Sequence, residues 1–79
     1  MNHQIPEKMT RMVFKVERKN INYIRNTLES YDGMALVRTL DPYKGLIEVY
    51  ISPGCEKFIE ELIEDLKNRE GISFSKNDG

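Results

Sequence analysis

The stretch DPYKG at residues 41–45 stands between two apolar runs and constrains the fold of this chain more than any other feature. Pro42 fixes its own backbone angle for a turn, Asp41 can accept a hydrogen bond from a nearby backbone amide, and Gly45 tolerates a positive φ. The apolar runs on either side have the length and composition of strands. The sequence therefore predicts a β-hairpin in the middle of the chain.

Hydrophobic periodicity predicts the elements on both sides of this hairpin. Polar and apolar residues alternate in 10–17, as in a half-buried strand, whereas apolar residues recur at helical spacing in 21–31. Ser52-Pro53 is a favourable start for a second helix, because Ser is a good N-cap and Pro suits the first helical position. The predicted elements are a strand at 10–17, a helix from Asn20 or Asn22 to Asp32-Gly33, strands at 34–40 and 46–51, a helix from Ser52-Pro53 to Gly71, and a short strand with Ile72 and Phe74.

This order of elements is typical of one fold class. Two βαβ halves with right-handed crossovers give an α+β, ferredoxin-like βαββαβ domain, in which a four-stranded antiparallel sheet has two helices on one face. We expect the domain to occupy residues 10–76, between a flexible N-terminal arm at 1–9 and a polar tail at 77–79. A chain of 79 residues is near the lower limit for a self-sufficient core, so self-association is expected.

Charge and cysteine usage narrow the classes of function. The chain has 12 basic and 13 acidic residues and a net charge of −1, whereas proteins that grip nucleic acid usually have a basic excess. Cys55 is the only cysteine, so no internal disulfide can form. The sequence has no signal peptide and no apolar run near the roughly 20 residues that span a bilayer. We therefore expect a cytoplasmic protein without a membrane partner.

Residues suited to catalysis or metal binding are few. His3 is the only histidine and falls in the expected arm, which leaves a serine or cysteine nucleophile without a well-placed base. Cys55 is expected in the first turn of the second helix, where it serves as a small packing residue rather than a reactive thiol. The glutamates of that helix suit a solvated face better than a metal site. We expect no catalytic residue, no metal, no cofactor and no enzyme activity.

RNA-binding RRM domains share the predicted topology and supply an alternative function. Their third strand begins with a basic residue and Gly and then carries aromatic rings on which bases stack. Residues 44–51 begin in the same way but place Leu46 and Glu48 where those rings belong, and only Tyr50 remains as an aromatic. A nucleic-acid-binding role would instead use a basic edge made of Arg11, Lys15, Arg18, Lys19 and Arg38.

The face of the sheet without helices is the most informative surface that the pattern predicts. If the odd-numbered residues of 47–51 face the helices, their neighbours face outward, and alternation assigns part of the other strands to the same side. The outward apolar residues are Val13, Met34, Leu36, Leu46 and Tyr50, with Lys15, Arg38 and Glu48 at their edge. Such a patch usually marks a partner contact, here expected to be a second copy in a homodimer. Scattered surface residues, or cover by the N-terminal arm through Ile5, are the alternatives.

Arg38 is the one residue of this region that local structure does not explain. Alternation places it on the helix-free face beside apolar neighbours, so it is the first candidate for holding an anionic small molecule. Tyr31 and Asp41 are the further candidates for such a ligand site. Arg38 can also pair with Glu48 across the hairpin.

The segment ESYDGMA at 29–35, running into VRTLDP at 37–42, resembles ACT-like domains. The resemblance extends over residues 11–74 and is strongest to an uncharacterised bacterial family of short, single-domain ACT-like proteins. It implies the ferredoxin-like fold and a regulatory module that binds amino acids or other small metabolites at a dimer interface. The usual ACT ligand signature is an acidic residue followed shortly by Pro-Gly in the first βα loop, whereas residues 17–21 of this chain read ERKNI.

Overall fold

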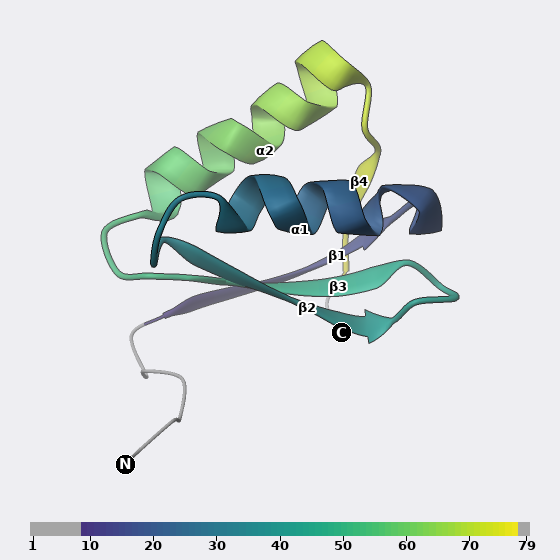
Figure 1. Cartoon of the computed structure of the whole chain (residues 1–79), viewed down its shortest axis with the longest axis horizontal. Coiled ribbons are helices and arrows are strands. Elements are labelled where there is room, and N and C mark those ends of the chain that lie inside the picture. Colours follow the sequence, from purple (N-terminus) through teal and green to yellow (C-terminus); the bar gives the residue numbers. More distant parts are fainter. Residues whose placement is uncertain (1–8, 78–79) are drawn as a thin grey trace.

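The computed structural model describes residues 9–77 of the chain (Figure 1). Its elements are β1 (Thr10–Val16), the 3-10 turn η1 (Arg18–Asn20), α1 (Ile21–Glu29), β2 (Ala35–Asp41), β3 (Leu46–Ile51), α2 (Glu56–Glu70) and β4 (Phe74–Lys76). The elements follow one another in the predicted order. Most of the predicted arm, residues 1–8, and the last two residues of the predicted tail, 78–79, lie outside the described part of the chain.

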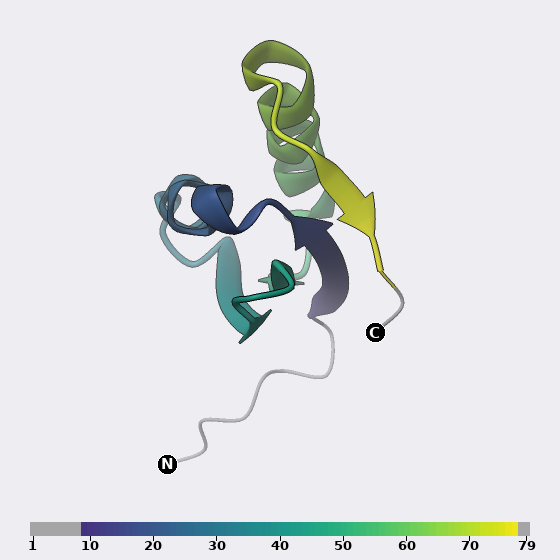
Figure 2. The same cartoon turned by 90° about the vertical axis from the view of Figure 1, so that its right-hand side faces the viewer.

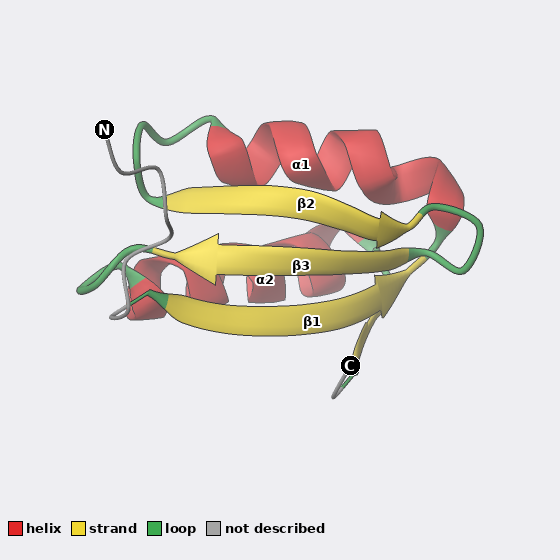
Figure 3. Ribbon diagram, turned by 90° about the horizontal axis from the view of Figure 1, so that it is seen from below, coloured by secondary structure: helices red, strands yellow, loops and turns green. Residues whose placement is uncertain are grey.

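The four strands form one antiparallel sheet in the order β2-β3-β1-β4. Both helices lie behind the same face of this sheet, and the opposite face carries no helix (Figure 3). The strand order and the one-sided helices confirm the ferredoxin-like α+β fold. β4 is short and pairs only with residues 14–16 of β1. It follows α2 in the chain and forms the edge of the sheet beside β1 (Figure 2).

The buried core lies between the sheet and the helices. Ile47, Val49 and Ile51 of β3 are fully buried, so the predicted alternation of this strand is confirmed. The helices contribute the buried apolar residues Ile21, Ile24, Leu28, Ile59, Ile63 and Leu66. The apolar stripes predicted at helical spacing therefore pack against the strands, and burying them removes apolar surface from water.

α1 ends at Glu29, earlier than the predicted Asp32-Gly33. The amide and the hydroxyl of Ser30 both donate to the Thr27 carbonyl, at 3.3 and 2.7 Å, and close the last helical turn. Gly33 has φ +74° in the loop that follows, where glycine adopts the left-handed region without a steric penalty. The glycine thus marks the turn into β2 rather than the end of the helix.

α2 begins later than the predicted Ser-Pro start. Its first residue is Glu56, whereas Ser52 lies in the turn after β3. The Ser52 amide donates to the Met34 carbonyl at 2.9 Å, and its hydroxyl donates to the Gly33 carbonyl. Because Ser52 is bonded to a segment far from it in the sequence, it links two loops instead of capping the helix, and the local prediction was wrong here.

The hairpin turn between β2 and β3 has the predicted chemistry. Oδ1 of Asp41 accepts hydrogen bonds from the amides of Tyr43 and Lys44, at 3.0 and 3.1 Å. Gly45 has φ +73°, which confirms the need for glycine at this position. The turn residues therefore determine the geometry by which β2 leads into β3.

Candidate functional site

The helix-free face of the sheet gathers side chains from β1, β2 and β3. Glu48 of β3 lies opposite Val13 of β1 and Arg38 of β2, and directly opposed residues of antiparallel strands share a face. The same register places Arg11, Lys15, Leu36, Leu46 and Tyr50 on this face, and the alternating exposure of β2 adds Leu40. We define the helix-free face by Arg11, Val13, Lys15, Leu36, Arg38, Leu40, Leu46, Glu48 and Tyr50.

A carboxylate lies at the centre of this face between two arginines. Glu48 is only 4% exposed, and it is the one buried charged residue in the part of the chain that the structure describes. Nε of Arg11 donates to its Oε2, and Nη1 of Arg38 lies 3.6 Å from its Oε1. The pairing of Arg38 with Glu48 across the hairpin is therefore as predicted, and Arg11 completes a cluster from three neighbouring strands.

The environment keeps Glu48 ionised. Burial by itself favours the neutral carboxyl group, but hydrogen bonding with Arg11 and Tyr50 and the charges of Arg11 and Arg38 outweigh it. The pKa of Glu48 therefore lies below its ordinary value, and the pKa of Arg11 is raised chiefly by its hydrogen bond to Glu48. Oε1 of Glu48 is shielded from solvent and accepts no hydrogen bond from a described residue.

The apolar part of the helix-free face is most exposed along β2. Leu36 is 45% exposed and Leu40, which the sequence prediction omitted, is 42% exposed. Leu40 has no cross-strand partner because the register shifts between Thr39 and Asp41. The exposure of β2 nevertheless alternates through Leu36, Arg38 and Leu40, and this alternation was the signal that could have identified Leu40.

The remaining predicted members of this face differ in exposure. Leu46 and Tyr50 are half-buried, and Val13 is buried although it does not belong to the core beneath the helices. Met34 differs from the prediction: it precedes β2 and packs against the buried core. Alternation holds only within a strand, so it could not place a residue that lies in the preceding turn.

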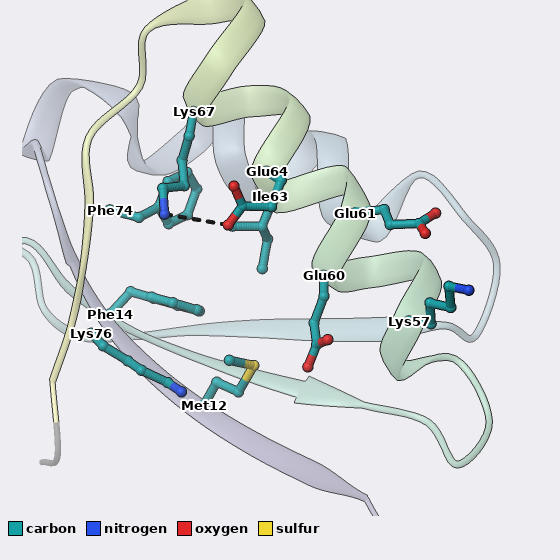
Figure 4. Close-up of a pocket in the computed structure, with 10 residues that line it drawn as sticks. All are labelled: Met12, Phe14, Lys57, Glu60, Glu61, Ile63, Glu64, Lys67, Phe74 and Lys76. Carbon is teal, nitrogen blue, oxygen red and sulfur yellow. Dashed lines mark hydrogen bonds and ion pairs between the residues drawn. The ribbon is translucent and has the colours of Figure 1, made fainter.

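A groove lies on the other side of the sheet, between α2 and the strands β1 and β4 (Figure 4). Its volume is about 590 Å³, within the range of small-molecule sites. The Phe14 and Phe74 rings meet edge to face at its base, with their centroids 5.4 Å apart. The groove is lined by the apolar residues Met12, Phe14, Ile63 and Phe74 and by the charged residues Lys57, Glu60, Glu61, Glu64, Lys67 and Lys76.

Comparison with known proteins places the chain in a family. A family model described as "Domain of unknown function (DUF4911)" matches residues 14–69, which is well over half of the chain. The chain belongs to the DUF4911 family. No curated protein and no solved structure matches it. The family's description gives no activity, and the ACT-like resemblance stays a prediction.

The part of this DUF4911 domain that the family model matches contains only part of the candidate site. Residues 14–69 include Arg38 and Glu48 together with nearly all of α2. Arg11 lies before the matched region and β4 lies after it. The family match therefore covers the central ion pair of the helix-free face but only one wall and part of the floor of the groove.

The three predicted ligand residues of this DUF4911 domain have separate structural partners. Arg38 is paired with Glu48 on the helix-free face, and Asp41 accepts the amide hydrogen bonds of the turn. Tyr31 lies on the helix side, where its ring meets that of Phe58 in α2 at 4.9 Å between centroids. The structure therefore does not bring Arg38, Asp41 and Tyr31 together around one hollow.

The charges of the groove are partly unpaired. Lys67 and Glu64 of α2 form an ion pair at 3.4 Å, but among the described residues no ion pair joins Glu60 or Lys76 to any side chain. Figure 4 shows these two side chains on opposite walls, both directed over Met12. The groove can therefore hold an apolar body and meet a polar or charged group at its mouth.

Residues 9–77, which the structure describes, contain no group of three His, Cys, Asp or Glu side chains placed to hold a metal ion. No helix among them is both long enough and apolar enough to cross a membrane.

Proposed function

We propose that this DUF4911 domain is a small binding module that forms a homodimer through its helix-free face. The observation that carries the proposal is the exposure of Leu36 and Leu40 beside a central carboxylate whose charge is already compensated by two arginines. Full burial of a leucine side chain contributes about 1.5–3 kcal/mol, and a two-fold interface buries each such residue twice. A short chain with a small core gains most from such an association.

The arrangement around Glu48 also supports a contact surface rather than a solvated one. An ionised carboxylate that is 4% exposed needs its partners held in place, and Arg11 and Arg38 hold it from both neighbouring strands. A second copy would cover the rim of this cluster and strengthen the interaction by excluding water. The role of Arg38 in this proposal is to organise the interface, and an anionic metabolite at Arg38 is not part of it.

The groove between α2, β1 and β4 favours a second binding function. Its apolar base and its volume of about 590 Å³ suit a small molecule with an apolar body. A regulatory module of the ACT-like kind would combine such a ligand with the dimer, although the groove lies on the helix side and away from the helix-free face. We propose no catalytic role and no cofactor for either surface.

The alternative role in nucleic-acid binding has weaker support. Arg11 and Arg38 of the proposed basic edge are already engaged by Glu48, which reduces the positive charge that they offer to a phosphate backbone. Arg18 and Lys19 lie in η1, at the end of β1 and outside the helix-free face. The five cations therefore do not form one continuous contact edge.

The oligomeric state of the full chain and of two variants tests the homodimer. We expect sedimentation equilibrium to show a dimer at micromolar concentration, and Leu36→Asp to shift it to monomer because the aspartate would be buried without a partner. Tyr43→Asp is the matched control, because Tyr43 lies in the hairpin turn, outside this face, and is 83% exposed. A parent protein that is monomeric throughout this range, or a Leu36→Asp variant that remains dimeric and folded, would reject the proposal.

A further inference from the structure

The end of the domain where η1 meets the β2–β3 turn forms a compact unit distinct from both surfaces above. The Val16 amide donates to the Gly45 carbonyl at 2.8 Å, which fixes the turn against the end of β1. The guanidinium of Arg18 lies over the Tyr43 ring, 5.5 Å from its centroid, and this distance is typical of a cation–π contact. The two loops therefore hold a cation and an exposed aromatic ring side by side.

A hollow of about 420 Å³ lies between these loops and the start of α1. Its lining residues are Arg18, Ile21, Asn22, Thr39, Pro42 and Tyr43. Tyr43 is 83% exposed, the highest exposure of any large apolar or aromatic side chain that the structure describes. One face of its ring is covered by Arg18, and the ring remains accessible to a second planar group.

Three cations lie at or near this hollow, and Arg18 is the one that lines it. Nη2 of Arg25 donates to Oγ1 of Thr39 at 2.8 Å, while Nε of Arg25 is shielded from solvent and has no acceptor among the described residues. Arg18 and Lys19 stand next to each other in η1. Within residues 9–77, no carboxylate forms an ion pair with Arg18, Lys19 or Arg25.

The carboxylates nearest in sequence to these loops are already used in local hydrogen bonds. Glu17 accepts a hydrogen bond from the side-chain amide of Asn20 at 3.4 Å, and Asp41 accepts the two amides of the hairpin turn. Neither is an ion-pair partner of the cations around the hollow. Both carboxylates keep their negative charge, but an added anion would find the Arg18 guanidinium without an ion pair among the described residues.

We propose that this hollow binds a phosphorylated ligand that carries an aromatic ring, that is, a nucleotide. The Arg18 guanidinium lines the hollow and suits phosphate oxygens, because Arg offers several N–H donors in a fixed planar arrangement, and Arg25 adds positive charge behind the lining residue Thr39. The base stacks on the exposed ring of Tyr43, and stacking on an aromatic side chain accepts any base. Lys19 adds charge beside the phosphates, and the site relies on side chains because residues 18–20 contain no glycine to form a backbone cradle.

Calorimetric titration of the full chain at low salt tests this site with three probes. ATP is expected to bind, inorganic pyrophosphate to bind more weakly, and adenosine to bind weakest because it lacks the phosphates. Arg18→Ala is expected to weaken both ATP and pyrophosphate by about tenfold or more, the effect of losing one charge-assisted hydrogen-bonding group. Tyr43→Ala is expected to weaken ATP and to leave pyrophosphate unchanged, which separates stacking from charge.

Two further variants test whether ATP binds at the hollow and not elsewhere on the protein. Lys57→Ala removes an exposed cation of α2 that lies on the groove and not on this hollow, and should leave ATP binding unchanged. Arg18→Lys keeps the charge and should retain part of the affinity, while thermal melting of each variant shows that it is folded. The proposal is overturned if ATP and pyrophosphate both fail to bind, or if they bind equally well to folded Arg18→Ala and Lys57→Ala variants.

The nucleotide can be a free molecule or part of a nucleic-acid chain, and a fourth titration distinguishes these two sources. A short single-stranded RNA that binds more tightly than ATP, with the same loss in Arg18→Ala and Tyr43→Ala, would identify the nucleotide of an RNA chain as the ligand. ATP that binds more tightly than the RNA would identify a free nucleotide. Neither result depends on dimer formation, so failure of the homodimer proposal and failure of this one are separate observations.

Discussion

The carbonyl oxygen of Val16 lies so close to Gly45 that a Cβ atom at residue 45 would come within 1.9 Å of it. The same glycine has φ +73° and accepts the Val16 amide with its own carbonyl. Two independent constraints thus exclude a side chain here, namely backbone conformation and backbone contact. The end of β1 and the hairpin turn are joined through a position that only glycine can occupy without movement of the backbone.

Gly45→Ala is therefore expected to be strongly destabilising. The backbone of Val16 cannot move without disturbing β1, so we expect a loss of at least about 2 kcal/mol in the free energy of unfolding, measured by urea denaturation. Gly33→Ala is the matched control, because Gly33 also has a positive φ but has nothing within 4 Å of its Cβ position. It should cost about 1 kcal/mol from strain alone. Equal losses in the two variants would contradict the role of the Val16 contact.

Glu48→Gln is expected to lower stability at neutral pH by about 1–3 kcal/mol, because Arg11 and Arg38 then lose their buried counter-charge. The pKa of Glu48 in the folded protein lies below its ordinary value of 4.5, so its contribution is complete above that value and is lost as pH falls through the folded pKa. The parent and Glu48→Gln should thus differ at neutral pH, and the difference in urea denaturation should narrow as the pH falls below 4.5 through the folded-state pKa.

The exposed Glu61 supplies the control for this pH dependence. Its carboxylate has no hydrogen bond or ion pair with any described residue, and Glu61→Gln should follow the parent at both pH values. A gap between the parent and Glu48→Gln that stays constant from neutral to acid pH would show that the ionised form of Glu48 does not carry the stabilisation.

Glu29→Ala is expected to weaken the outer edge of the sheet. Oε2 of Glu29 accepts the Val37 amide at 2.8 Å, and Val37 belongs to β2, a strand at the edge of the sheet. Removing this acceptor should cost about 1 kcal/mol and should increase edge-to-edge association, because an unpaired edge amide can bond to another chain. Urea denaturation and light scattering measure the two effects. Asn26→Ala, at an exposed residue of the same helix, is the control. If Glu29→Ala has the same effects as Asn26→Ala, the Glu29 carboxylate does not protect this edge of the sheet.

A ligand of the groove is expected to raise the melting temperature of the domain. Binding to the folded state alone stabilises it by about 2.7 kcal/mol at a ligand concentration of 100 times Kd. A panel of small apolar acids and amines, measured by thermal shift, should yield at least one compound whose effect is reduced by Met12→Ala and retained in Lys44→Ala, because Lys44 is an exposed cation of the hairpin turn that does not line the groove. A panel without any shift, or a shift insensitive to Met12→Ala, would remove the groove as a ligand site.

Local sequence patterns predicted correctly the features whose physical cause lies within a short segment of the chain. The turn at 41–45 needed only the side-chain chemistry of Asp41 and the conformational freedom of Gly45, and both are found as predicted. The pairing of Arg38 with Glu48 followed from strand alternation and a hairpin register. Predictions of this kind depend on residues within one turn or one hairpin, whose relative positions follow from turn chemistry and strand alternation.

Local patterns failed where a residue is used by a distant segment. Ser52 has the chemistry of an N-cap, but its hydroxyl is bonded to the Gly33 carbonyl, and α2 begins at Glu56 instead. Met34 has the apolar character of a face residue, but it packs against the core. In both cases the competing contact becomes available only when separate loops meet.

The sequence by itself determined the order of the elements, the side of each strand that enters the core and the chemistry of the hairpin turn, because periodicity and turn residues act over short distances. The tertiary structure alone decided that Arg11 joins Arg38 at Glu48 and that the charge of Glu48 is buried. It also decided that η1 and the turn at 41–45 leave Arg18 over the ring of Tyr43, and that α2 and β4 enclose a groove over β1. These features join segments far apart in the chain, and their geometry depends on how the sheet and helices pack.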